Sequence, residues 1–391
     1  MPSRSSWVLV SSTGCPLADR RVVGVGPPGA RIALVGEAPG EGEERLGVPF
    51  VGASGRLLDK MLSAAGIQRS ACYITNVSKV RPSRNDFAER YREKGQPTPE
   101  LRVLWDELRD ELLAVKPNVI VALGAEALEA LTGKKGITDW RGSLQQGIAG
   151  KTIGTLHPAY VCRMYEARRI VEHDLRRALE ESSVPELELP EHEFQVDPSF
   201  EQAMGVLGWL TLSGKTVSFD IETLGPRIRC LGFAWSASEA ICIPFTSSRA
   251  PASLEDRNGS IHVPAPTDTP FRSHWSEKEE LELLHVCNTI LSNPAQPLIA
   301  QNFPFDASYL EREFGIVCRG LAMDTMVAQH CCYSELPKSL NFLCSFYTRT
   351  PCYWQYNASS DLETWRYNCY DCAVTWEVAQ VLEQELKELQ A

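Results

Sequence analysis

The sequence contains no run of apolar residues long enough, at about eighteen or more, to cross a bilayer as a helix. It also lacks the basic and then apolar segment of a secretory signal at its N-terminus. We therefore expect a soluble, cytoplasmic protein without a membrane partner. The 391 residues are enough for two domains with separate hydrophobic cores.

A regular cysteine framework is absent as well. The 13 cysteines are odd in number and scattered, which argues against the disulfide scaffold of a small secreted domain and for reduced thiols. Cys369 and Cys372 have a spacing that structural zinc sites use. They also flank Asp371 in a predicted helix, where a helical spacing is enough to explain them, so the sequence leaves both interpretations open.

Basic residues are scarce in the second half of the chain. Residues 1–183 hold 26 Lys and Arg against 22 Asp and Glu, a balance of +4, whereas the remainder holds 13 against 28, a balance of −15. The first half is therefore better suited to contacting phosphates. The acidic second half is compatible with a DNA substrate if some of its carboxylates bind metal ions, because bound cations reverse the local field.

Apolar, strand-like runs alternate with helical stretches in the first half. The runs lie at 31–35, 72–75, 118–123 and 151–156, with helical segments such as 55–65 and 99–115 between them. This alternation predicts an α/β domain with a parallel sheet between two helical layers. We expect this domain at 1–183, followed by an acidic, Pro-rich linker at 184–198.

The second domain is expected at 199–391. A helix is predicted at 199–212, and strands at 217–219, 228–235 and 240–245. The segment 246–273 is dense in Pro, Ser and charged residues, which predicts an exposed insertion. From residue 276 onward the pattern predicts mostly helices.

Acidic residues recur in three segments of this second domain: Asp220-Ile-Glu222, Asn302-Phe-Pro-Phe-Asp306 and Tyr367-Asn-Cys-Tyr-Asp371. Carboxylates gathered at one place repel one another unless cations neutralise them, so the pattern predicts a site for two divalent ions, Mg²⁺ or Mn²⁺. Two such ions can activate a water molecule and stabilise the leaving oxygen of a phosphodiester. The expected metal ligands are Asp220, Glu222, Asp306 and Asp371.

Tyr367 and Asp371 are one helical turn apart, so their side chains share a face and the phenol can orient the attacking water. From residue 198 to the end, the chain resembles the DEDDy class of 3′-5′ exonucleases, most closely the proofreading domain of family A DNA polymerases. Asp324-Thr-Met and Ser339-Leu-Asn-Phe-Leu lie where that family has helices. The resemblance implies a ribonuclease H-like (DnaQ-like) fold, a substrate of single-stranded or frayed 3′ ends, and a substrate contact by Asn302.

Gly36-Glu37-Ala38-Pro39-Gly40 directly follows a strand in the first domain. It lacks the Lys-Ser/Thr of a P-loop and the Gly-x-Gly-x-x-Gly fingerprint. Together with Pro49-Phe50-Val51-Gly52, Thr75-Asn76-Val77, Arg81-Pro82-Ser-Arg-Asn85, Arg141-Gly142 and His157-Pro158-Ala159, it resembles the family 4 uracil-DNA glycosylases over 12–180. These motifs follow strands, where open α/β sheets bind ligands.

The glycosylase resemblance implies a role for each motif. His157 would stabilise the negative charge that develops on a flipped-out uracil as the glycosidic bond breaks. Asn76 would pair with the uracil edge, and Phe50 would stack on its face. The remaining implied positions are the catalytic Glu37, Glu43 and Asn85, which would place water or stabilise the sugar cation, and Gly36, Ala38 and Gly40 in the substrate-binding turn.

The chain departs from the glycosylase family at its iron–sulfur ligands. Three of the four positions that correspond to cluster cysteines hold Ser12, Val80 and Pro97, which leaves Cys15. One thiolate cannot hold a cubane cluster, so no iron–sulfur cluster is expected. Asp86 also replaces an arginine of the family, which removes a positive charge from the presumed DNA side.

The two resemblances together predict a DNA-processing enzyme similar to the front end of some phage family A polymerases, without the polymerase domain. We expect a proofreading or repair factor of phage DNA replication, in the cytoplasm of an infected bacterium, that acts with a separate DNA polymerase. Its substrate would be DNA, with uracil as a possible target. In the alternative hypothesis, the first domain is a non-catalytic module that binds DNA or a polymerase.

Overall fold

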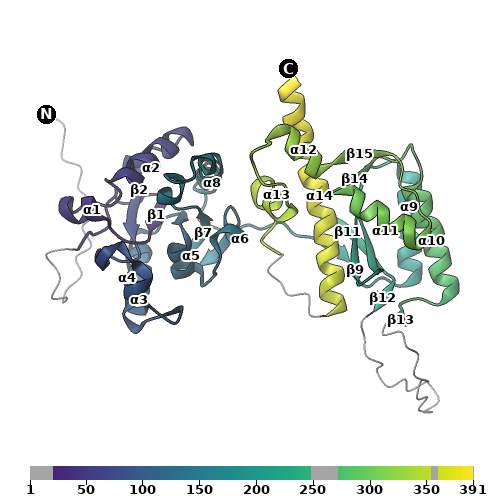
Figure 1. Cartoon of the computed structure of the whole chain (residues 1–391), viewed down its shortest axis with the longest axis horizontal. Coiled ribbons are helices and arrows are strands. Elements are labelled where there is room, and N and C mark those ends of the chain that lie inside the picture. The colour runs from purple at the N-terminus through teal and green to yellow at the C-terminus, as the bar shows by residue number, and fades with distance from the viewer. Residues whose placement is uncertain (1–20, 248–271, 354–359, 391) are drawn as a thin grey trace, which may run out of the picture. The chain divides into compact units, whose positions relative to one another are not determined.

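The computed structural model describes residues 21–247, 272–353 and 360–390 (Figure 1). The chain divides into two compact units, Met1–Leu189 and Pro190–Ala391. Each unit contains its own sheet and its own hydrophobic core. In the described residues, no helix combines the length and the apolar character needed to cross a membrane.

The first unit is built on a five-stranded sheet in the order β2-β1-β5-β7-β6. Its strands are β1 (Ile32–Gly36), β2 (Cys72–Asn76), β5 (Val119–Leu123), β6 (Leu144–Gly147) and β7 (Gly150–Thr155). β2, β1, β5 and β7 pair in parallel in that order, and β6 forms the edge strand by pairing antiparallel with β7. β1, β2 and β5 are buried along their whole length, as expected for parallel strands covered on both faces.

Helices cover both faces of this sheet. Figure 1 shows α2 (Ala53–Ala64) and α8 (Arg168–Glu181) on one side, and α4 (Pro99–Val115) and α5 (Ala125–Thr132) on the other. α4 begins at the Thr98 N-cap with a proline in its first turn. The shorter elements are α1 (Glu41–Leu46), α3 (Phe87–Tyr91), α6 (Ile137–Trp140), α7 (Pro158–Val161), η2 (Arg69–Ala71), η3 (Ser83–Asn85), η4 (Tyr165–Ala167) and the pair β3 (Arg92–Glu93) and β4 (Gln96–Pro97).

The second unit is built on a six-stranded mixed sheet in the order β15-β14-β9-β10-β11-β8. Its strands are β8 (Glu193–Gln195), β9 (Val217–Leu224), β10 (Arg227–Ala234), β11 (Glu239–Pro244), β14 (Leu298–Ala300) and β15 (Leu321–Asp324). The centre is an antiparallel meander, and β14 joins β9 in parallel. The short pair β12 (Thr246–Ser247) and β13 (Arg272–Ser273) lies outside this sheet.

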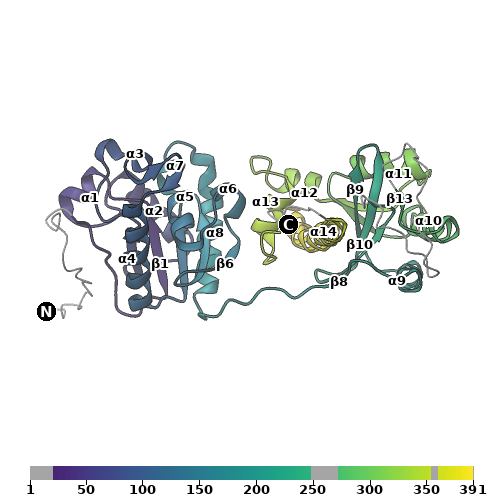
Figure 2. The same ribbon diagram turned by 90° about the horizontal axis from the view of Figure 1, so that it is seen from below.

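The long helix α14 (Asp361–Gln390) packs on one face of the second sheet. Figure 2 shows it on the opposite side of β9 and β10 from α9 (Phe200–Ser213), α10 (Glu277–Leu291) and α11 (Phe303–Phe314). α12 (Thr325–Cys332) and α13 (Leu340–Tyr347) pack against α14. Serine capping boxes begin α9 and α10.

The predicted fold class is confirmed in its architecture: a sheet between two helical layers in the first unit, followed by a mixed sheet with helices on both faces in the second. Eight of the described strands were not predicted: β6, β8, β14 and β15 in the two main sheets, and the two-residue strands β3, β4, β12 and β13. β8 lies inside the segment 184–198 that the sequence suggests as a linker, and β14 and β15 lie where mostly helices were expected. β8, β14 and β15 form through pairing with residues distant in sequence, so local patterns do not reveal them, whereas β6 pairs with the adjacent β7 in a hairpin. Most of the expected insertion, residues 248–271, lies outside the described residues.

Candidate active sites

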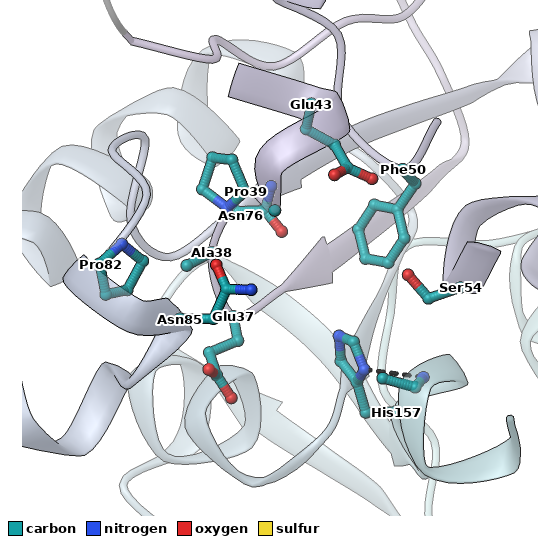
Figure 3. A pocket seen from close by; sticks show the side chains of 12 residues that line it. Glu37, Ala38, Pro39, Glu43, Phe50, Ser54, Asn76, Pro82, Asn85 and His157 are labelled. Atoms are coloured by element: carbon teal, nitrogen blue, oxygen red, sulfur yellow. Dashed lines mark hydrogen bonds between the residues drawn. The ribbon is translucent and has the colours of Figure 1, made fainter. Parts of the chain in front are cut away.

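A cavity of about 210 Å³ opens in the first unit at the carboxyl ends of its parallel strands (Figure 3). Gly36 ends β1, Asn76 ends β2, and His157 follows β7. The cavity lining contains all the site residues that the sequence predicts in this domain except Gly36, which ends β1 beside it. Its lining residues are Glu37, Ala38, Pro39, Gly40, Glu43, Phe50, Ser54, Asn76, Pro82, Asn85, His157 and Ala159.

Phe50 is held in the cavity wall by an unusual backbone. Its φ of 54° lies in the left-handed region, which is costly for a bulky aromatic residue. Two glycines make room for this turn: a Cβ on Gly55 would lie 1.9 Å from the Phe50 carbonyl oxygen, and a Cβ on Gly36 would lie 2.4 Å from the Phe50 ring. Glu43 holds the next residues, because its Oε1 accepts hydrogen bonds from the amides of Val51 at 3.1 Å and Gly52 at 2.9 Å.

His157 is arranged as a neutral hydrogen-bond donor. Its Nδ1 accepts a hydrogen bond from the Ala159 amide at 3.1 Å, so the ring proton resides on Nε2. Figure 3 shows that the other ring nitrogen faces the cavity. Burial, and to a smaller extent the charge of nearby Arg163, lowers the pKa of His157 to about 4. The Phe50 and His157 ring centroids are 6.0 Å apart.

Glu37 lines the cavity next to Asn85, on the other side from His157, and its carboxyl group points away from Phe50 (Figure 3). Burial raises its pKa to about 7, and the charges of Glu126 and Asp86 act in the same direction. Asn85 has a φ of 58° and accepts a hydrogen bond at Oδ1 from Arg81 at 2.7 Å. The carboxyl group of Glu37 therefore changes charge near neutral pH, inside a site that also holds a neutral imidazole.

The second site lies where β9, α11 and α14 meet. Asp220 and Glu222 are two residues apart on β9, so their side chains point to the same face. Asp371 on α14 completes a group with these two residues. One carboxylate oxygen from each of the three lies within 4.8 Å of the other two. In the described part of the chain, this is the sole group of three or more such ligands. Asp306 is outside it but adjacent: its Oδ1 accepts the Ile221 amide at 3.0 Å.

The electrostatics of this acidic group fit a cation site. Burial raises the pKa of Asp220 well above its usual value, and Asp306, Asp371 and Glu222 raise it further. Burial likewise raises the pKa values of Glu222, Asp306 and Asp371. Hard carboxylate oxygens that repel one another in a buried place are suited to hard divalent ions, which would restore their ionised form.

Tyr367 lies beside these carboxylates, as the helical spacing predicts. Burial raises the pKa of its phenol, and Asp371, Glu222 and Asp220 raise it further, so the phenol stays protonated. Asn302 is the N-cap of α11, with a φ of 60°. Its amide and that of Phe303 donate to the Asp324 carboxylate at 3.2 and 2.9 Å.

Three residues near the sites were missed by the sequence analysis. Tyr353 donates a hydrogen bond from its hydroxyl to Asp371 Oδ1 at 2.6 Å, and the Nδ2 of Asn368 donates to Asp220 Oδ2 at 2.9 Å. Ser54 lines the glycosylase-like cavity. Asn368 lies inside the quoted motif and could have been noticed there, whereas nothing in the sequence around Tyr353 or Ser54 marks a site.

Two further sequence questions are settled in part. Cys369 and Cys372 are buried on α14 against Cys230 and Cys242, and within the described ranges no cysteine belongs to a group of ligands close enough to share a metal ion. Packing therefore explains the Cys369/Cys372 spacing better than zinc.

Of the positions relevant to the iron–sulfur cluster, Ser12 and Cys15 lie outside the described residues. Asp86 caps α3 by accepting the Glu89 amide at 2.8 Å.

Comparison with known proteins assigns both units. A family model described as the uracil DNA glycosylase superfamily matches residues 23–181, and a 3′-5′ exonuclease model matches residues 211–387. The type-4 uracil-DNA glycosylase of Thermotoga maritima is 43% identical over 175 residues, which cover 42% of this chain and 86% of that protein. The chain belongs to the uracil-DNA glycosylase superfamily. Its second unit is a 3′-5′ exonuclease domain of the DNA polymerase A type.

One relative matches across both domains. The DNA polymerase of Bacillus phage SP01 is 27% identical over 315 residues, which cover 78% of this chain and 33% of that polymerase. Among solved structures, Escherichia coli RNase D aligns with a TM-score of 0.31 and 12% identity, over 51% of this chain and 46% of that protein. At that identity and TM-score, the RNase D likeness supports no statement about activity. The glycosylase and exonuclease assignments rest on the sequence matches.

Proposed function

We propose that the exonuclease domain removes nucleotides from DNA 3′ ends with the help of two divalent ions, Mg²⁺ or Mn²⁺. The ions would be held by Asp220, Glu222, Asp306 and Asp371, and would supply an activated water and stabilise the leaving oxygen. The observation that carries this proposal is the close approach of oxygens from Asp220, Glu222 and Asp371, within 4.8 Å of one another. Tyr367, protonated and beside these acids, would orient the water, and Asn302 would contact the substrate.

In the glycosylase domain, we propose that the cavity accepts a flipped-out uracil. Phe50 would stack on the base, Asn76 would pair with its edge, and the turn of Gly36, Ala38 and Gly40 would border it. His157, as a neutral donor, would stabilise the uracil anion as the bond breaks. Glu37, Glu43 and Asn85 would place water and stabilise the sugar cation.

We further propose that the chain serves phage DNA replication, in the cytoplasm of an infected bacterium, as a proofreading and repair factor for a DNA polymerase on another chain. The similarity to a phage DNA polymerase over 78% of this chain supports the link to phage DNA replication. In this proposal the domains extend over 1–183 and 199–391, joined by the segment 184–198.

The experiment that tests the nuclease uses the full chain and a 3′-labelled single-stranded oligonucleotide with Mg²⁺. Asp220→Ala combined with Glu222→Ala removes two carboxylates from the acidic group, so digestion should fall to background. A thermal unfolding transition of the second domain at the wild-type position would show that the mutated domain is folded, and uracil release in EDTA would report on the first domain. Full digestion by the variant, or by the wild type in excess EDTA, would refute the metal-dependent site.

A further inference from the structure

A buried lysine, Lys79, contacts the backbone of the cavity residue Asn76. Lys79 is 5% exposed and follows β2 by three residues. Its ammonium group has three N–H donors, and three acceptors surround it: Thr75 Oγ1 at 2.7 Å, the Asn76 carbonyl oxygen at 2.6 Å and Glu111 Oε2 at 2.6 Å. None of the cavity motifs includes Lys79, and it does not line the cavity.

The lysine fixes one peptide group from one end. The carbonyl of Asn76 accepts from Lys79, while the amide of the same peptide group, Val77 N, donates to the Gly36 carbonyl at 2.9 Å. Because a peptide group is planar and rigid, holding both ends sets its orientation. That orientation fixes the backbone angle that aims the Asn76 side chain, which lines the cavity.

Lys79 forms a buried ion pair with Glu111, whose Oε2 lies 2.6 Å from its ammonium nitrogen. Burial lowers its pKa, and the adjacent Glu111 carboxylate opposes this effect. Glu111 is itself held, because its Oε1 accepts a hydrogen bond from the Tyr73 hydroxyl at 2.7 Å. A charge-assisted hydrogen bond to a carbonyl is stronger than a neutral one, so this arrangement resists rotation of the Asn76 peptide.

We propose that Lys79 is a positioning residue for base recognition, which holds Asn76 in the orientation that pairs with uracil. The proposal rests on the proposed glycosylase function. It predicts that loss of the ammonium weakens recognition of the base and leaves contacts to the DNA backbone intact. A merely structural role predicts loss of stability without a selective loss of base binding.

The chain offers a matched control. Lys151 and Glu181 form a second buried Lys–Glu pair in the same domain, at 2.9 Å, and neither lines the cavity. Lys79→Met with Glu111→Gln removes the ammonium without leaving an unpaired buried carboxylate, and the Gln keeps an acceptor for Tyr73. Lys151→Met with Glu181→Gln makes the same change at the control pair.

Three measurements on the full-length variants in EDTA separate the roles: kcat and KM for uracil release, the inhibition constant for free uracil, and the Kd for an abasic-site oligonucleotide. For the Lys79 variant, the inhibition constant should rise roughly 10- to 100-fold, the range expected for loss of a charged hydrogen bond. Its Kd for abasic DNA should stay unchanged. The control variant should change neither, although both melt at lower temperature. An unchanged inhibition constant in the Lys79 variant, or equal rises in both, would overturn the proposal.

A second readout is independent of activity. If the wild type neither releases nor binds uracil, the proposed glycosylase function fails, and amide hydrogen exchange at Val77 decides the role of Lys79. Faster exchange at Val77 in the Lys79 variant than in the control variant supports the positioning role. Equal exchange in the two variants contradicts it.

Discussion

Asn368 binds Asp220 twice through a single nitrogen: its Nδ2 donates to the Asp220 backbone carbonyl at 3.1 Å and to Oδ2 at 2.9 Å. This contact joins α14 to β9 and fixes the orientation of one carboxylate in the acidic group. The contact depends on Gly232 of β10, which pairs with Asp220 across the two strands. A Cβ at position 232 would lie 2.3 Å from Asn368 Oδ1 and 2.6 Å from Cys372 Sγ, too close for either atom. The close approach of helix and sheet therefore requires glycine at 232.

Tyr367→Phe should slow hydrolysis of single-stranded DNA by roughly 10²-fold or less, because its hydroxyl only positions water. Binding of the same oligonucleotide, measured by anisotropy with Ca²⁺ in place of Mg²⁺, should change little. Tyr347→Phe is the matched control, since its hydroxyl donates to Gln329 Oε1 at 2.7 Å away from the acidic group. Wild-type hydrolysis by Tyr367→Phe would argue against the DEDDy assignment.

His157→Ala should reduce uracil release by on the order of 10²–10³-fold, the cost typical for removing a donor that stabilises developing negative charge. The measurement is single-turnover release from a uracil-containing oligonucleotide in EDTA. Exonuclease activity of the same protein in Mg²⁺ should remain at the wild-type level. If wild type and variant both release no uracil but bind DNA, the first domain is a recognition module.

Uracil release should depend on pH through Glu37. Its pKa is raised to about 7, so the carboxylate is lost as the pH falls through 7 and is fully present above it. If the carboxylate is the active form, kcat/KM should fall about tenfold per pH unit below 7 and level off above it. His157, with a pKa of about 4, stays neutral above pH 5 and adds no step. In Glu37→Gln the step near pH 7 should disappear, and its persistence would assign it to another group.

Purified protein should be colourless and free of iron, because Ser12, Val80 and Pro97 offer no thiolates to a cluster. Metal analysis and a visible absorption spectrum check this. Stoichiometric iron with a broad visible band would show that other cysteines of the chain serve as ligands.

The sequence by itself was sufficient for the elements whose signal is local. Runs of consecutive apolar residues predicted β1, β2, β5 and the strand meander of the second domain. The spacing of Tyr367 and Asp371, one helical turn apart, predicted that they share a helix face. Most motif residues of the first domain gathered around one cavity at the carboxyl ends of the parallel strands, whereas Arg141 does not line it and pairs with Asp174.

The tertiary structure alone decided what depends on contacts between distant segments. β8 forms by pairing with β11, and β14 forms by pairing with β9. The local sequence of β8 and β14 does not predict these pairings. The hydrogen bond from Tyr353 to Asp371 and the ion pair between Lys79 and Glu111 join residues whose spacing in the sequence does not indicate contact. The pKa values of Glu37 and His157 likewise follow from burial, which is a property of the packed chain and not of the residue type.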